Sequence, residues 1–348
     1  MSVPGGGRIR RLVKRIGHRS SVSGLILMYH RIAELDCDPW GLAVSPAHFA
    51  QHLDVLRNLQ SVISLADLVQ ARRSGDLPSR PVIVTFDDGY ADNVDTAMPL
   101  LEHHAILATI FLTTGAIASG REFWWDELER VLLDSGDLPR VLDLGESDWT
   151  YRRDLGADAT YGDEARRKHR LWRAWEPPPT VRHEVYYELW QRLYVLPARQ
   201  KRALLDALFD WAGLDSVMRL SHRLVSVDEV MRLGRSTSIE VGAHTVTHPV
   251  LPALTIASQT EEIRECQRFL EGLLDRRVTA FAYPHGHHDA STLSIVRDAG
   301  FTSACTTAGR PVSEHSDCFA LPRFQVLDWN GDEFRERLRA WHNADADA

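Results

Sequence analysis

The chain has 348 residues, of which 44% are hydrophobic and 25% charged, so it is long enough for one large α/β domain or two ordinary ones. The formal net charge of −8 argues against nucleic acid as a bulk partner, because binding to phosphates needs a basic surface. No C-x-x-C pair occurs among the four cysteines, which argues against a disulfide framework or a thiolate zinc site and favours a reducing compartment.

Residues 1–23 form a basic N-terminal tail with no apolar run long enough for a signal-peptide core or a membrane span. Its basic residues are Arg8, Arg10, Arg11, Lys14, Arg15 and Arg19. One interpretation is a solvated tail, and the other is a short amphipathic segment that rests on anionic lipid. We therefore expect a cytoplasmic protein, and the second interpretation adds peripheral contact with the inner membrane face.

The first part of the chain alternates between strand and helix patterns. Strands are predicted at 25–29 (LILMY), 82–86 (VIVTF) and 108–114, because these runs are apolar and rich in β-branched residues. Helices are predicted at about 45–59 and 93–104, the first with a serine cap and a proline at its first turn.

The pattern changes over 121–222, which we interpret as a Trp-rich helical insertion. Helix-like stretches lie near 125–135 and 182–210, with charged loop between them. The tryptophans form either the core of the insertion or an aromatic roof over a substrate cleft. Trp124 and Trp125 are adjacent on a predicted helix, so we expect at least one of them to face the cleft.

Regular alternation resumes after the insertion. Ser226 and Glu229 form a capping box that opens a helix. Further strands are predicted at 238–244, 278–283 and 301–306, and further helices at 258–274 and 291–299. Strands that alternate with helices predict an α/β fold with a parallel sheet, open or closed into a barrel, whose chemistry lies at the carboxyl ends of the strands.

The predicted strand ends carry an unusual number of polar side chains, namely His30, Asp87, Asp88, His244, His248 and His285. The Asp87-Asp88-Gly89 segment is either a simple turn with an Asx cap or a buried strand end where one carboxylate binds a metal and its neighbour faces a water.

His244 and His248 are spaced for metal binding, although sixteen histidines make chance spacings common. The β-branched residues between them and Pro249 after them predict a strand that runs into a turn. Two histidines with one carboxylate are typical of a catalytic zinc site.

Three segments together resemble the polysaccharide deacetylases (carbohydrate esterase family 4, the NodB-homology domain). They are T-F-D-D-G at 85–89, H-T-V-T-H at 244–248 and F-A-Y-P-H-G at 281–286. The resemblance covers 24–120 and 223–327. It implies a distorted (β/α)7-8 barrel, related to the TIM barrel, over 24–120 and 223–345, with the insertion at 121–222 forming part of the substrate cleft.

The resemblance also implies a role for each matched residue. Asp87 would be the general base, and Asp88, His244 and His248 would bind a metal, usually Zn²⁺, with another divalent transition metal as the alternative. The backbone N–H of His285 would help to form an oxyanion hole. The activity implied is removal of an N-acetyl group from an amino sugar. We expect the cleft to be lined by Trp124, Trp125, Tyr283 and Pro284.

Two departures from the common family pattern stand out. Ala282 occupies the position of the arginine that steadies the catalytic aspartate, and Arg323 is a candidate to replace it. The C-terminal L-x-H motif is missing, but Leu27-Met28-Tyr29-His30 looks like that motif moved to the N-terminus, as in a permuted branch that includes poly-N-acetylglucosamine deacetylases. His30 is then the predicted acid for the departing amine, and the alternative is a buried structural histidine.

We expect a small or lipid-linked intermediate of glycan biosynthesis as the substrate, because an aromatic roof would narrow the open groove that long polymers need. The alternatives are a deformylase or deacylase that acts on another amide-bearing sugar, and a catalytically inactive barrel that only binds carbohydrate.

Overall fold

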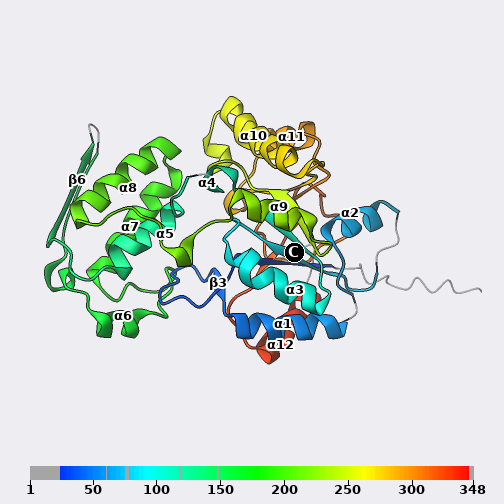
Figure 1. Ribbon diagram of the computed structural model, residues 1–348, viewed down its shortest axis with the longest axis horizontal. Helices are drawn as coiled ribbons and strands as arrows, with labels where there is room; N and C mark the ends of the chain where they lie inside the picture. Colours follow the sequence, from blue (N-terminus) through cyan, green and yellow to red (C-terminus); the bar gives the residue numbers. More distant parts are fainter. Residues whose placement is uncertain (1–23, 60, 75–77, 118, 147–148, 345–348) are drawn as a thin grey trace, which may run out of the picture.

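The computed structural model describes residues 24–59, 61–74, 78–117, 119–146 and 149–344 (Figure 1). The N-terminal tail that we interpreted as solvated or lipid-bound lies outside these residues. Within the described ranges, no helix combines the length and the apolar character that crossing a membrane requires.

A seven-stranded sheet forms the centre of the larger part of the molecule. Its strands follow the order β10-β9-β8-β5-β4-β1-β11, and every neighbouring pair is parallel. The bounds are β1 Leu25–Tyr29, β4 Val82–Phe86, β5 Ala108–Leu112, β8 Ile239–Ala243, β9 Ala280–Ala282, β10 Ser303–Cys305 and β11 Phe324–Gln325. The side chains of β1, β4 and β5 are all buried, which fits their nearly continuous apolar sequences in a sheet that is covered on both faces.

The sheet is a partial barrel whose edge strands are β10 and β11. Leu321, just before β11, forms a parallel bridge to Cys305 in β10, so the two edges approach each other. The predicted α/β fold with a barrel-like parallel sheet is therefore confirmed. The N-terminal strand β1 lies between β4 and β11 rather than at an edge.

Helices surround the sheet (Figure 1). They are α1 Pro46–Leu59, α2 Leu65–Ser74, α3 Met98–His104, α4 Thr114–Ile117, α9 Val227–Arg235, α10 Ile256–Leu274, α11 Ala290–Asp298 and α12 Gly331–His342. The capping box predicted for α9 is present, since the Ser226 side chain accepts from the Glu229 N–H and the Glu229 carboxylate accepts from the Ser226 N–H. The C-terminal helix α12, which the sequence patterns did not predict, packs beside α1.

The insertion forms the second lobe on the left of Figure 1, with a hydrophobic core of its own. Its elements are α5 Trp124–Glu129, the π-helical turn η2 Arg130–Asp134, β6 Val141–Glu146, β7 Trp149–Asp154, α6 Asp163–His169, α7 Val181–Val195 and α8 Ala198–Ala212. The antiparallel hairpin β6–β7 differs from the expected charged loop. Partly buried and exposed side chains alternate along β7, a strand pattern that its charged residues conceal.

Candidate active site

A cavity of about 340 Å³ opens where β1, β4 and β8 end. Side chains from both the barrel and the insertion line it. They are Met28, His30, Trp40, Leu42, Asp87, Asp88, Trp125, Trp190, Tyr194, His244, His248, His285, Thr307 and Gln325. The predicted titratable residues of four strand ends therefore meet in one cavity, as expected for a parallel sheet.

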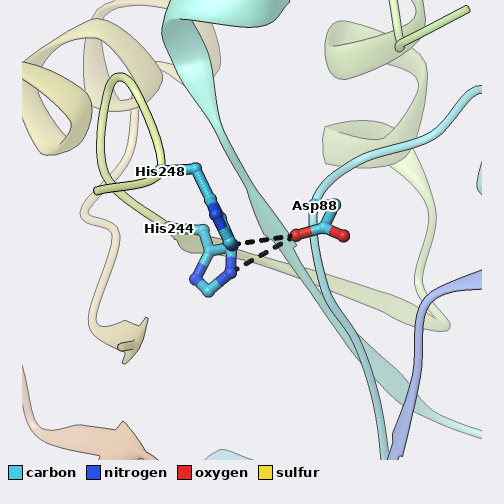
Figure 2. A group of neighbouring side chains, drawn as sticks. All are labelled: Asp88, His244 and His248. Atoms are coloured by element: carbon cyan, nitrogen blue, oxygen red, sulfur yellow. Dashed lines mark ion pairs between the residues drawn. The ribbon is translucent and has the colours of Figure 1, made fainter. Parts of the chain in front are cut away.

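Asp88, His244 and His248, which all line this cavity, converge on one another (Figure 2). Oδ1 of Asp88 lies 3.5 Å from Nε2 of His244 and 3.3 Å from Nε2 of His248. One ligand atom from each residue lies within 4.8 Å of the others, and all three side chains are buried. Asp88 and His248 have positive φ angles of 74° and 56°, so the turns after β4 and β8 hold these residues in an uncommon conformation.

The hydrogen bonds of this trio suit a divalent cation. Nδ1 of His244 lies 2.7 Å from the carbonyl oxygen of Ala282 and must donate to it, which leaves Nε2 as a lone-pair donor that faces Asp88. A carboxylate oxygen and a neutral imidazole nitrogen repel each other unless a proton or a cation lies between them. Two nitrogen ligands and one oxygen ligand match the protein ligands of a catalytic zinc site.

Electrostatics keep Asp88 ionised. Burial acts to raise the pKa of Asp88, but the interactions with His244 and His248 outweigh it and hold the pKa well below its ordinary value. The pKa of His248 is lowered because burial disfavours its charged form, and Asp88 only partly opposes this effect. The His248 side chain therefore favours the neutral form that a metal requires.

Arg323 holds Asp87 in place. Its Nη1 and Nη2 donate to the two carboxylate oxygens of Asp87 at 2.7 Å and 2.6 Å, and its Nε donates to the Thr306 carbonyl at 2.9 Å. Burial acts to raise the pKa of Asp87, but the charges of Arg323 and His244 and the hydrogen bonds from Arg323 prevail, so the pKa is lowered. Asp87 is thus an oriented carboxylate that is ionised at neutral pH. Arg323 lies just before β11.

His30 and His285 complete the titratable lining of the cavity. His30 follows β1 and is half-buried. His285 lies in the turn Pro284–Gly286 with a φ of 57°, and its ring centroid is 4.5 Å from that of His248. Burial lowers the pKa of His285 well below its ordinary value, so its imidazole is neutral.

Three residues expected at the cleft do not line the cavity, namely Trp124, Tyr283 and Pro284. Trp124 and Trp125 are both buried, because α5 is enclosed by α7, α8 and the barrel, and only Trp125 reaches the cavity. Tyr283 points into the interior, where its hydroxyl donates to the Phe319 carbonyl. Successive side chains here point to opposite faces of the sheet, so Ala282 packs in one hydrophobic cluster and Tyr283 packs in another, away from the cavity.

Sequence reasoning missed seven lining residues: Met28, Trp40, Leu42, Trp190, Tyr194, Thr307 and Gln325. Trp190 and Tyr194 are four residues apart on α7, a spacing that indicates one helix face but not what that face contacts. Their approach to strand ends of the barrel depends on tertiary packing.

Comparisons with known proteins agree with this fold. The family model for polysaccharide deacetylase matches residues 74–136 and 217–304. Among solved structures, the deacetylase PplD of Streptococcus pyogenes in complex with acetate has a TM-score of 0.57 at 18% identity and covers 93% of this chain and 100% of its own. IcaB of Ammonifex degensii has a TM-score of 0.54 at 19% identity and covers 93% of this chain and 98% of its own.

A further structural neighbour is BC0361, a polysaccharide deacetylase from Bacillus cereus, with a TM-score of 0.54 at 16% identity, covering 91% of this chain and 69% of its own. No curated protein matches the sequence. The two segments that match the family model include Asp87 and Asp88 in the first and His244, His248 and His285 in the second. The chain therefore belongs to the polysaccharide deacetylase family.

Proposed function

We propose that the protein is a zinc-dependent amide hydrolase that removes an N-acetyl group from an amino sugar. The observation that carries this proposal is the buried Asp88, His244 and His248 trio beside an aspartate that Arg323 clamps, inside a cavity at the strand ends. Family membership supports deacetylation as the reaction class.

Asp88, His244 and His248 would hold the metal. Zn²⁺ fits the two-nitrogen, one-oxygen ligand set, and other divalent transition metals with the same ligand preference are alternatives. When bound, such a cation supplies Lewis-acid polarisation of the acetyl carbonyl and makes water a stronger nucleophile.

The other residues would move protons and hold charge. Asp87 accepts the proton of the attacking water, since Arg323 keeps its carboxylate ionised and fixes its orientation. The backbone N–H of His285 donates to the developing oxyanion, and His30 protonates the departing amine. Both of these roles rest on the family resemblance together with the place of His30 and His285 in the cavity lining.

The proposed substrate is small or lipid-linked. A cavity of about 340 Å³ lies at the low end of the range for small-molecule sites, roughly 300–1,000 Å³. Aromatic side chains of the insertion take part in its lining, which restricts a long polymer. Peripheral membrane contact through the basic residues of 1–23 is part of the same proposal, at about 1 kcal/mol of attraction per Lys or Arg near an anionic leaflet.

Metal content and turnover together test this proposal. We expect Asp88→Ala, His244→Ala and His248→Ala each to lose stoichiometric zinc, as measured by atomic emission, because a three-ligand site does not tolerate a missing ligand. Asp87→Asn is the matched control. It should keep zinc and yet lose acetate release from N-acetylated oligosaccharides by a factor on the order of 10² to 10⁴, and His30→Ala should lose activity similarly.

Full zinc occupancy in all three alanine variants would refute the metal assignment. Formate or a longer acid released in place of acetate, from substrates that carry other acyl groups, would point instead to a deformylase or deacylase.

A further inference from the structure

Four rings form a continuous wall on one part of the cavity. We call Trp40, Trp190, Tyr194 and His285 the aromatic wall. The Trp40 and Trp190 ring centroids are 4.2 Å apart, those of Trp190 and Tyr194 are 4.8 Å apart, and those of Tyr194 and His285 are 4.5 Å apart. All four residues line the cavity, so the wall is one connected surface built from barrel and insertion together.

Helix α7 of the insertion holds this wall in position. Tyr186, Trp190 and Tyr194 recur every four residues and so share one face of the helix. The buried hydroxyl of Tyr186 accepts a hydrogen bond of 2.9 Å from the indole N–H of Trp40, which anchors the barrel end of the wall to α7. The rings are thus fixed before any ligand binds, which reduces the entropic cost of binding.

The wall differs from the tryptophans that form the core of the insertion. Trp124 and Trp172 are buried, whereas Trp40, Trp190 and Tyr194 are only half-buried and keep part of their surface in the cavity. Apolar ring surface that remains exposed inside a concave site is typical of a ligand-binding surface.

The wall ends beside the metal trio. The ring of His285 packs against that of His248 at 4.5 Å and 79°, so the last ring of the wall touches a proposed metal ligand. Gln325 and Thr307 add hydrogen-bonding groups to the same cavity. A ligand on the wall would therefore have an apolar face, a hydroxyl-bearing edge and one end at the trio.

We propose that the aromatic wall binds the pyranose ring that carries the scissile acyl group and thereby determines specificity for saccharides. The inference rests on the proposed function and deepens it. The C–H face of a pyranose covers Trp190 and Tyr194, and its hydroxyls bond to Gln325 and Thr307. The wall thus contributes to sugar binding, whereas the trio and Asp87 act on any acyl group.

Two substrates separate these contributions, an N-acetylglucosamine tetramer and ethyl acetate, which has an acetyl group but no ring. In zinc-loaded protein, Trp190→Ala and Tyr194→Ala should each raise KM for the tetramer about tenfold, because loss of a ring contact of this kind is equivalent to about 1.4 kcal/mol. Hydrolysis of ethyl acetate should change less than about threefold, since its binding needs no ring contact. Tyr187→Ala is the matched control, because Tyr187 is on the same helix, exposed and outside the cavity lining.

Calorimetric titration of the tetramer onto the Asp87→Asn protein gives a readout that does not depend on turnover, and Tyr194→Phe should restore binding that Tyr194→Ala loses. An unchanged KM and an unchanged binding constant in both wall variants, with the fold intact by circular dichroism, would overturn the inference. If the wild-type protein hydrolyses ethyl acetate but does not bind the tetramer, the role of the aromatic wall would be refuted, whereas the proposed hydrolase function would stand. Tetramer binding that depends on the wall, with no turnover of either substrate, would support the wall and refute the proposed function.

Discussion

In the common family pattern, an arginine of the third matched segment (281–286 in this chain) steadies the catalytic aspartate. Here the ion pair between Asp87 and Arg323 takes the place of that interaction. Ala282 has no side chain to reach Asp87, and Arg323 reaches it from the segment before β11 instead. Both side chains are buried, so each charge depends on the other for its solvation. A resemblance could suggest Arg323 as a candidate, but only the approach of β11 to β1 shows how it reaches Asp87.

We expect Arg323→Met to lower the free energy of unfolding by about 3–5 kcal/mol, because it leaves a buried carboxylate without a partner. Adding Asp87→Asn should recover part of that loss. The depressed pKa of Asp87 means that the contribution of the pair is present above the ordinary carboxyl pKa and is lost as the pH falls through the folded value. Urea denaturation at pH 7 and at about pH 2.5, which is below the ordinary carboxyl pKa of about 3.9, measures both effects.

Arg57→Met is the matched control for this pair, since Arg57 and Asp54 form an ion pair in which both side chains are 55% exposed. It should change stability by no more than about 0.5 kcal/mol. If Arg323→Met and Arg57→Met change the free energy of unfolding equally, burial of the Asp87 pair adds nothing to stability.

At the scale of elements, α5 joins the insertion to the barrel. The Trp125 indole N–H donates to the Tyr90 hydroxyl at 2.9 Å, and that hydroxyl donates to Asp126 at 2.7 Å. Tyr90 lies in the segment after β4, three residues beyond Asp87. Burial raises the pKa of Asp126 to about 8, against the opposing charge of Arg31. This junction therefore contains a carboxyl group that resists ionisation.

The raised pKa of Asp126 predicts a pH-dependent stability. A carboxyl with a folded pKa near 8 stabilises the fold at low pH, and this contribution is lost as the pH rises from the unfolded pKa through the folded one. Relative to wild type, Asp126→Asn should therefore gain up to about 4 kcal/mol between pH 5 and pH 8, at about 1.4 kcal/mol per unit. Urea denaturation of both proteins at the two pH values measures this gain. A difference in the free energy of unfolding that is the same at both pH values would contradict the prediction.

Strand ends were predictable from the sequence because buried parallel strands have a nearly uniform apolar composition that stops abruptly at polar residues. The 82–86 run ends at Asp87, and the run that ends at Ala243 leads to His244. The β6–β7 hairpin was not predictable in this way, because Thr150, Arg152 and Asp154 make the exposed face of β7 resemble a loop. The aromatic wall was hidden for another reason, since its four rings come from three distant segments.

On the scale of the whole molecule, two hydrophobic cores meet at the candidate active site. The barrel core and the insertion core are separate clusters. Trp125 of the insertion nevertheless packs against His248 of the barrel, with ring centroids 4.9 Å apart. A metal bound by His248 would therefore stabilise a side chain that both lobes contact.

Zinc should consequently stabilise both lobes together. At a free zinc concentration about 100 times its Kd, the free energy of unfolding should rise by about 2.7 kcal/mol. Circular dichroism and tryptophan fluorescence should report one thermal transition that moves upward together, and His248→Ala should show no shift. Two separate transitions, of which zinc moves only one, would show that the lobes unfold independently.

The position of β1 between β4 and β11 has a consequence for the timing of synthesis. Asp87 leaves the ribosome long before Arg323, which follows it by 236 residues. At translation rates of about 5–20 residues per second, this interval lasts roughly 10–50 s. Throughout this interval the nascent chain has its proposed base but not the arginine that orients it, so the catalytic apparatus is assembled only after the segment before β11 has been synthesised.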